Sequence, residues 1–464
     1  MTTYTSITDA DRTEMLSAVG LSSIDELFAD VPSSLRLPDP LDLPRGCSER
    51  EVFDELRRMA ERNVSCDDEI SFLGGGMYDH YVPALVDAIT SRSEFLTPYT
   101  PYQPEVSQGG LQVMFEYQTA ISELTGLPVS NASVYDGPSA VAAAGYMSRL
   151  HTGRGRLVCS RALHPHSRET LQTSAEGWKA ELSEVPLRNA VTDPEALAER
   201  VDENTSAVFV QQPNFLGAVE DIESLAAVAH ERGALLVCSC DPIALGVLRS
   251  PGECGADVAV GEGQPLGNRL DFGGPSFGFF AAREEFLRRM PGRIAGETTD
   301  LNGDRGFVLT LQTREQHIRR ERATSNICTA QALNALAGIV YLSWLGKRGL
   351  VELCHLLAER THRLRLALAG IPGISPIHDQ PVVREFAVEL GAPVEQVVEH
   401  CVAEGVNPGH PLGTEYPEYP NGLLVALTEQ RTPEHINRLI DVLGRAVAAS
   451  KASNPGPSSS KESS

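Results

Sequence analysis

The sequence predicts an α/β protein: a large domain built on a mostly parallel sheet, followed by a small α+β domain. Five apolar runs of strand length occur between residues 156 and 282, and such continuous runs are typical of strands buried on both faces. Helical stretches such as 222–233 separate several of them, and near the C-terminus strands and helices alternate in a different order. The five runs are RLVCS (156–160), SAVFV (206–210), ALLVCS (234–239), ADVAVG (256–261) and GFFAA (278–282).

An N-terminal arm precedes the large domain. We expect residues 1–69 to be mainly helical, with a proline-rich connector at 32–44 and a further helix around 51–63. Two residue pairs match the capping pattern that opens helices, namely Thr8 with Asp11 and Ser23 with Glu26.

The other boundaries follow from the same patterns. The large domain is predicted to span residues 70–330, and a long linking helix with the small α+β domain is predicted to span 331–448. Thr432 as N-cap and Pro433 at the first helical position open the last predicted helix. The tail at 449–464 has no apolar face to bury, so we expect it to be disordered.

Composition limits the location and the kinds of partner. A net charge of −23 would repel nucleic acid and anionic membrane surfaces. No stretch approaches the roughly 20 apolar residues of a membrane helix, and the N-terminus lacks a secretory signal. The nine cysteines are scattered along the sequence, which indicates free thiols. No two pairs of Cys or His residues stand at the spacing of a zinc site. We therefore expect a cytoplasmic protein without a metal site.

Several long strings resemble one family, the glycine-cleavage P-protein, in its alpha subunit or the N-terminal half of its fused form. The resemblance runs from about residue 8 to 446. It implies the fold-type-I pyridoxal-phosphate transferase fold, similar to aspartate aminotransferase, which has the same order of domains. The strings are SFLGGGMYDHYVP (71–83), FLTPYTPYQPEVSQG (95–109), PGECGADVAVGEGQPLG (251–267), FGGPSFGFFA (272–281) and LQTREQHIRRERATSNICTAQ (311–331).

The resemblance also exposes a gap in the chemistry. Pyridoxal phosphate is held as a Schiff base on a lysine, and an aspartate normally pairs with its ring nitrogen. By the resemblance, the aspartate position falls on Cys238, with Asp241 three residues later, and the lysine position falls on Gln264. The chain has four lysines, and none lies between residues 180 and 346. We therefore expect this chain to lack the Schiff-base lysine.

In the two-gene form of the family, a beta subunit carries the lysine and the aspartate. The resemblance then implies a glycine dehydrogenase (aminomethyl-transferring) whose alpha subunit, this chain, works in an α2β2 complex. The complex would decarboxylate glycine and transfer the aminomethyl group to the lipoyl arm of H-protein. Pyridoxal phosphate would be bound covalently by the partner subunit, and the active site would lie at the contact between the two subunits.

Three positions are candidates for contacts to the partner's cofactor phosphate. Thr324, Ser325 and Asn326 stand just before a predicted helix, where backbone N–H groups favour an anion. Related fold-type-I enzymes place a threonine of the neighbouring subunit at a comparable point. The alternative is an ordinary N-cap by Ser325 or Asn326.

A stiff segment supplies candidates for the substrate or lipoyl pocket. Prolines exclude a central strand or helix in FLTPYTPYQPE, so Tyr99, Tyr102 and Glu105 are expected on an extended loop. Rigid loops often line a site or an interface. The alternative is a packing segment that only seals the subunit contact.

Two histidine and glycine motifs resemble cofactor contacts. His164 matches a histidine that stacks on the cofactor ring in the family's active subunit, although here a structural role is the alternative. The segment YDGPSA at 135–140 resembles the phosphate-binding turn, with Gly137 and Ser139 as donors, or it survives only as part of the fold. A metal site at His164 and His166 would need further ligands.

Basic residues cluster at 314–320. Arg314 and His317, followed by Arg319 and Arg320, could orient the glycine carboxylate or bind a phosphate. Salt bridges across the subunit contact are the alternative.

Two other functions remain open at this point. The chain could be a non-catalytic scaffold or regulatory paralogue of the beta subunit. It could also be a self-sufficient pyridoxal-phosphate enzyme, such as an amino-acid decarboxylase or a cysteine desulfurase.

Overall fold

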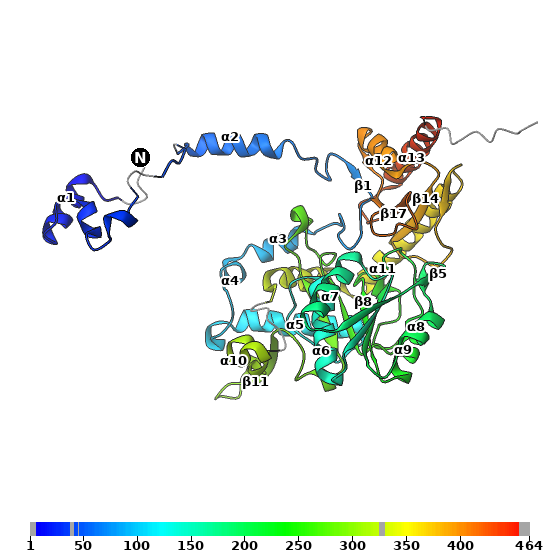
Figure 1. Ribbon diagram of the computed structural model, residues 1–464, viewed down its shortest axis with the longest axis horizontal. Coiled ribbons are helices and arrows are strands. Elements are labelled where there is room, and N and C mark those ends of the chain that lie inside the picture. The colour runs from blue at the N-terminus through cyan, green and yellow to red at the C-terminus, as the bar shows by residue number, and fades with distance from the viewer. Residues whose placement is uncertain (1–5, 38–40, 45, 324–329, 454–464) are drawn as a thin grey trace, which may run out of the picture. The chain divides into compact units, whose positions relative to one another are not determined.

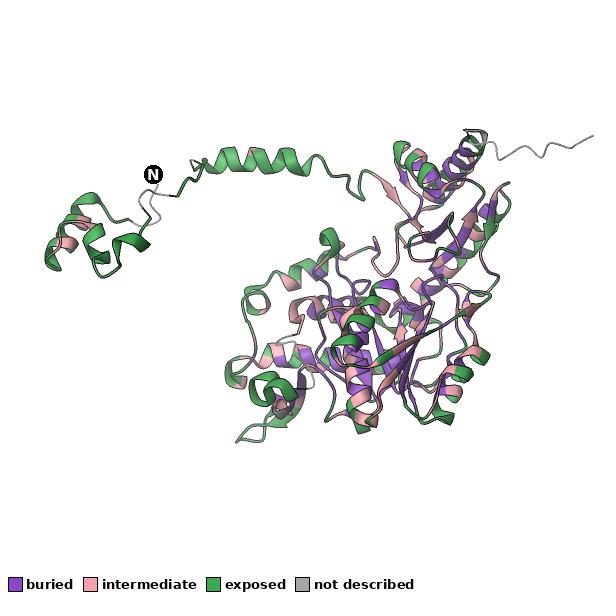
Figure 2. Ribbon diagram, in the orientation of Figure 1, coloured by how far each residue is buried: buried purple, intermediate pink, exposed green. Residues whose placement is uncertain are grey.

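The computed structural model describes residues 6–37, 41–44, 46–323 and 330–453, in two units, Met1–Ser65 and Cys66–Ser464. The elements of the first unit are α1 (Asp9–Ala18), η1 (Ile24–Phe28), η2 (Ser33–Leu35) and α2 (Glu49–Ala60). Thr8 caps α1 in a complete capping box with Asp11, and Ser23 accepts a hydrogen bond from the Glu26 N–H, as predicted. None of these four elements contains a buried residue (Figure 2).

A seven-stranded sheet forms the centre of the second unit (Figure 1). In spatial order its strands are β2 (Val129–Ser130), β10 (Gly278–Ala282), β9 (Val258–Glu262), β8 (Leu235–Cys240), β7 (Thr205–Gln212), β3 (Arg156–Ser160) and β4 (Glu181–Val185). The pairs from β9 to β4 are parallel, whereas β10 runs antiparallel to both of its neighbours. The predicted α/β architecture is confirmed, and each of the five predicted runs forms a strand.

Helices cover both faces of this sheet, because successive strand residues point to opposite sides. In β7, Ala207 and Phe209 pack in one core, and Val208 and Val210 pack in the other. The first core is completed by α6 (Gly137–Thr152) and α7 (Pro165–Gly177). The second is completed by α5 (Gln108–Thr125), α8 (Pro194–Arg200), α9 (Ile222–Glu231) and α11 (Ala332–Ala369).

A small α+β lobe follows α11. Its sheet has the order β13 (Ile374–Pro376), β14 (Glu385–Leu390), β17 (Gly422–Ala426) and β16 (His410–Pro411). Two helices, α12 (Val394–Ala403) and α13 (Pro433–Ser453), pack with this sheet around a separate apolar core. The Thr432 hydroxyl accepts a hydrogen bond from the His435 N–H at the start of α13. Because α13 continues to Ser453, it includes the first residues of the segment expected to be a disordered tail.

The remaining elements connect these layers. A hairpin that the sequence patterns did not predict, β11 (Ile294–Thr299) with β12 (Arg305–Thr310), packs against α5. Further elements are α3 (Ala84–Thr90), α4 (Ser93–Leu96), η3 (Pro104–Val106), α10 (Gln316–Arg319), the parallel pair β1 (Ile70–Ser71) and β15 (Val406–Asn407), the hairpin β5 (Leu187–Arg188) and β6 (Val191–Thr192), and five short 3₁₀ turns, η4 (Ala244–Gly246), η5 (Asp271–Gly273), η6 (Glu284–Phe286), η7 (Gln312–Arg314) and η8 (Arg320–Arg322). Within the described ranges, no helix is long and apolar enough to cross a membrane.

Candidate functional site

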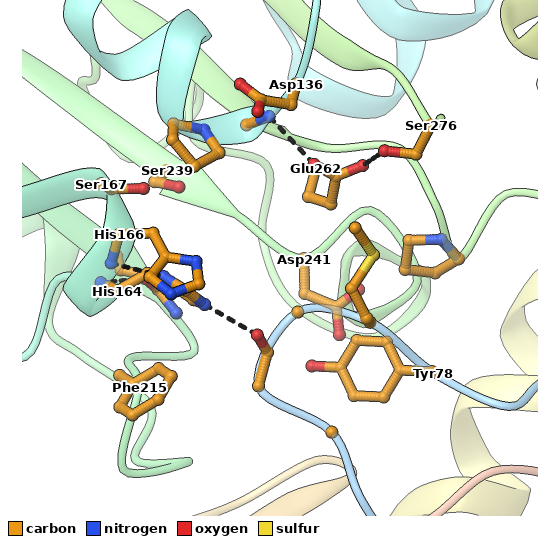
Figure 3. Close-up of a pocket in the computed structure, with 18 of the residues that line it drawn as sticks. Tyr78, Asp136, His164, His166, Ser167, Phe215, Ser239, Asp241, Glu262 and Ser276 are labelled. Atoms are coloured by element: carbon orange, nitrogen blue, oxygen red, sulfur yellow. Dashed lines mark hydrogen bonds between the residues drawn. The ribbon is translucent and has the colours of Figure 1, made fainter. Parts of the chain in front are cut away.

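A cavity of about 690 Å³ lies at the carboxyl ends of the parallel strands (Figure 3). Its wall includes Gln211 near the end of β7, Asp241 directly after β8 and Glu262 at the end of β9. The turn after β3 adds His164, and the small lobe adds Arg384. Open α/β sheets bind ligands in this crevice, so its position agrees with the one expected for a cofactor or substrate.

His164 lines the cavity but is held by the chain itself. Its Nε2 lies 2.7 Å from the carbonyl oxygen of Gly75, and its Nδ1 accepts a hydrogen bond from the His166 N–H at 3.1 Å. The ring meets Phe215 edge to face, with centroids 4.9 Å apart. Burial lowers the pKa of His164 to about 4, so the ring is neutral at pH 7 and donates through Nε2. Figure 3 shows the hydrogen bond between His164 and the carbonyl oxygen of Gly75.

Asp241 and Arg384 form a two-bond ion pair beside the cavity. The two nitrogens of the Arg384 guanidinium that face Asp241 each lie 2.6 Å from one of its carboxylate oxygens. The guanidinium also stacks on the Tyr78 ring, 3.4 Å from the centroid. Burial opposes the charge on Arg384, but the neighbouring Asp241 carboxylate raises the pKa of the guanidinium overall. This pair joins the end of β8 to the start of β14.

Glu385, the next residue, completes this buried network. Its carboxylate accepts hydrogen bonds from the Gly75 N–H and the Tyr78 hydroxyl, both at 2.7 Å. Burial raises the pKa of Glu385, and it raises the pKa of Tyr78 well above its ordinary value. The polar groups on this side of the cavity are therefore bonded to one another.

Glu262, at the end of β9, lies on the opposite side of the cavity, next to the start of α6. Its carboxylate accepts hydrogen bonds from Gly137 N–H and Gln264 N–H, each at 3.0 Å, and from the Ser276 hydroxyl at 2.5 Å. Burial raises the pKa of Glu262. Asp136 caps α6 by accepting the Ser139 N–H at 2.7 Å. The backbone N–H groups of Gly137 and Ser139, the two donors predicted for a phosphate-binding turn, are thus bonded to carboxylates. Figure 3 shows the bond to Glu262.

Cys238 and Gln264 do not face the cavity. Cys238 lies in the apolar core of the sheet with no exposed surface, and Asp241 lines the cavity instead. Gln264 is buried, and its amide donates to the carbonyl oxygens of Tyr78 and Asn268 at 3.0 and 2.8 Å. The Gln264 side-chain oxygen accepts the Tyr78 N–H at 2.9 Å. The Gln264 side chain therefore stabilises the backbone at Tyr78 and Asn268 through hydrogen bonds.

The structure brings two of the predicted residues, Tyr102 and His317, together at a second place. The ring centroids of Tyr102 and His317 lie 6.4 Å apart, edge to face, and the guanidinium of the buried Arg293 lies over the Tyr102 ring. The His317 ring lies 3.6 Å from the carboxylate of Glu315. Arg293 donates to the Tyr102 hydroxyl at 3.2 Å and forms an ion pair with Glu315 at 2.9 Å. Arg314 lies in the same segment, but its guanidinium donates to backbone carbonyls, including that of Gly292 at 3.0 Å.

The other predicted residues are less constrained. Tyr99 is 76% exposed, and Glu105 is also exposed. Thr324, Ser325 and Asn326 lie outside the described residues. Among the described residues, the cavity wall does not include Tyr99, Tyr102 or Glu105.

Sequence patterns missed Glu262, Arg384, Glu385 and Arg293. The available signal for Glu262 was its place at the end of a predicted strand, where sites gather in parallel sheets. Arg384 bonds to Asp241 and Arg293 bonds to Tyr102, and these partners lie 143 and 191 residues away in the sequence. No local sequence pattern could therefore have indicated either arginine.

Comparisons with known proteins place the chain in a family. The model of the family "Glycine cleavage system P-protein" matches residues 2–443. A relative from Geobacillus kaustophilus (strain HTA426), named "probable glycine dehydrogenase (decarboxylating) subunit 1", is 47% identical over 441 residues, 95% of this chain and 98% of the relative. A relative with the same name from Carboxydothermus hydrogenoformans is 49% identical over 441 residues, 95% of this chain and 99% of that relative.

Solved structures agree. The crystal structure of an inhibitor-bound glycine decarboxylase (P-protein) superimposes with a TM-score of 0.87 at 44% identity, covering 96% of this chain and 100% of that chain. Sphingosine-1-phosphate lyase from Burkholderia pseudomallei K96243 superimposes with a TM-score of 0.61 at 17% identity, covering 91% and 96%, and shows the fold alone. The predicted fold-type-I transferase fold is thereby confirmed. The chain belongs to the glycine cleavage system P-protein family, as a relative of its subunit 1.

Proposed function

We propose that this chain is an alpha subunit that works only with a beta subunit carrying pyridoxal phosphate on a lysine. Together, as an α2β2 complex, they would decarboxylate glycine and pass the aminomethyl group to the lipoyl arm of H-protein. The eight cysteines that the structure describes are all free thiols, which supports a reducing cytoplasm as the location.

One observation carries this proposal: no lysine is found among the described residues that line the cavity. Schiff-base attachment of the cofactor needs a primary amine, and an amide such as that of Gln264 cannot provide it. Of the described lysines, Lys179 follows α7, Lys347 lies in α11 and Lys451 lies in α13. None of these positions is in the cavity wall.

The other cavity groups also do not fit pyridoxal phosphate. The phosphate would meet the Glu262 and Asp136 carboxylates at the start of α6, where the N–H donors of Gly137 and Ser139 are already bonded. The candidate partner for the ring nitrogen, Asp241, is bonded to Arg384 through both oxygens. We therefore assign no chemical step to this cavity.

The N-terminal unit supports a protein partner. Its helix α2 presents Val52, Phe53, Leu56 and Met59 at helical spacing, and each side chain is between 45% and 59% exposed. A helix stripe of this kind is normally buried against another element, and a short helix gains most of its stability that way. Covering this stripe is the role we assign to the beta subunit.

We further propose that several side chains contribute to the partner's active site. The candidates are Tyr99, Tyr102, Glu105, His164, Arg314, His317, Thr324, Ser325 and Asn326. The exposure of Tyr99 and the placement of Tyr102 beside His317 support a contact surface here. The bonds of His164 and Arg314 to backbone carbonyls favour positioning roles for those two.

The exchange of glycine carboxyl carbon with CO2 tests the proposal. We expect no exchange above background with this chain alone, and full exchange when the beta subunit and H-protein are added. Tyr99→Ala in the complex should lower the rate about tenfold, which corresponds to ~1.4 kcal/mol of transition-state stabilisation.

The matched control is Leu301→Ala, a fully exposed apolar residue in the turn between β11 and β12. It should leave the rate unchanged. A complex that assembles and keeps its full rate in alanine variants of Tyr99, Tyr102 and His317 would point to a scaffold instead. Turnover by the isolated chain would refute the proposed dependence on a partner.

A further inference from the structure

The start of α6 has the features of an anion-binding site. The helix is 16 residues long, and its first residues, Gly137 and Pro138, border the cavity; Gly137 offers a backbone N–H there, whereas Pro138 has none. A helix N-terminus carries a partial positive charge and free N–H donors, and phosphate groups often bind there. The sequence of this turn, YDGPSA at 135–140, also resembles a phosphate-binding turn.

In this chain an acidic side chain already takes that position. The Glu262 carboxylate receives two backbone N–H donors, from Gly137 and Gln264, and one hydroxyl donor, from Ser276. Two amides and a hydroxyl around one anionic group are a donor set that would also suit a phosphate. These donors are therefore already bonded to a carboxylate, and that carboxylate is a side chain of the same protein.

The surrounding backbone holds Glu262 in place. A Cβ atom at Gly137 would lie 3.0 Å from the Glu262 nitrogen, so the start of α6 and the end of β9 approach closely. A Cβ atom at Gly278 would overlap the carbonyl of Asp136. Figure 3 shows Glu262 between the Asp136 turn and Ser276. These close approaches fix the backbone of Glu262 against the start of α6, so its carboxylate lies within hydrogen-bond reach of the Gly137 N–H.

We propose that Glu262 is a built-in anion that replaces a phosphate group at the start of α6 and so excludes phosphate-bearing cofactors from this chain's own cleft. The repulsion between a phosphate and a carboxylate in a partly dehydrated pocket is strong. The proposal deepens the proposed function, in which the partner holds the cofactor, and it rests on that function only for its biological purpose.

Binding of inorganic phosphate to the full-length chain tests this proposal. Glu262→Ala removes both the charge and the volume, and Glu262→Gln removes the charge while keeping the size. We expect at least about tenfold tighter phosphate binding for the alanine variant than for wild type, by calorimetry at constant ionic strength. Pyridoxal phosphate should show the same gain, and pyridoxal, which has no phosphate, should show none.

The matched control is Glu415→Gln. Glu415 is another carboxylate in the cavity wall, and it lies 3.5 Å from the His410 ring nitrogen. This variant should bind phosphate no better than wild type. If it gains as much as the Glu262 variants, net charge explains the effect and the proposal fails.

A folded Glu262 variant with wild-type phosphate affinity also overturns the proposal. Should the alanine variant fail to fold, the glutamine variant decides, because it keeps an oxygen that can accept the Gly137 N–H. None of these measurements uses glycine or a beta subunit. They can therefore fail while the exchange assay succeeds, and the reverse is equally possible.

Discussion

Arg384→Ala should lower the stability of the chain by about 3–5 kcal/mol, the usual cost of leaving one member of a buried ion pair alone. The Arg384 side chain is 4% exposed and that of Asp241 is 14% exposed. Without the guanidinium, the Asp241 carboxylate loses two hydrogen bonds and Tyr78 loses its stacking partner. The shift of the chemical denaturation midpoint measures the effect.

Arg445→Ala is the matched control for this prediction. Arg445 also makes two bonds to one carboxylate, Glu404, at 2.6 and 2.8 Å, but its side chain is 49% exposed. Water screens exposed pairs, so this variant should unfold close to wild type. Equal shifts for the two variants would show that the Arg384 pair does not join the lobes in the way described above.

Gly217→Ala should destabilise the chain by about 2–5 kcal/mol, because a left-handed backbone and a steric clash act together. Gly217 has φ +84°, and an added Cβ would overlap the Glu385 carbonyl. The loop it belongs to also carries Phe215, which packs on His164. The substitution should therefore shift the cavity wall as well as lower the unfolding midpoint.

Gly153→Ala separates the two causes. Gly153 ends α6 with φ +71°, but nothing lies within 4 Å of the added Cβ. Only the backbone cost of about 1 kcal/mol is expected there. If Gly217→Ala lowered the free energy of unfolding no more than Gly153→Ala does, the close contact between the Gly217 loop and β14 would be refuted.

The parts of the fold that sequence patterns predicted are those set by local physics. Continuous apolar runs marked β3, β7, β8, β9 and β10, because strands covered on both faces must be apolar throughout. Capping residues located several helix starts, since an N-cap acts over three residues. The hairpin of β11 and β12 was missed, although Asn302 and Gly303 in its connection were an available turn signal.

The candidate site was less predictable, because its bonds join distant segments. The Gly75 N–H reaches Glu385, and the Gly137 N–H reaches Glu262. The surroundings of Arg314 likewise could not be read from residue type: its side chain is buried and donates to backbone carbonyls such as that of Gly292. Whether it also contacts the partner's site stays a prediction.

Borohydride reduction tests most directly where the coenzyme is attached. The assembled complex, loaded with pyridoxal phosphate and freed of excess, would be reduced and digested, and the pyridoxyl-lysine peptide would be mapped by mass spectrometry. We predict one modified peptide, from the beta subunit, with Lys179, Lys347, Lys451 and Lys461 of this chain unmodified. Stoichiometric labelling of any of these four lysines, in a chain that turns over glycine alone, would contradict the account.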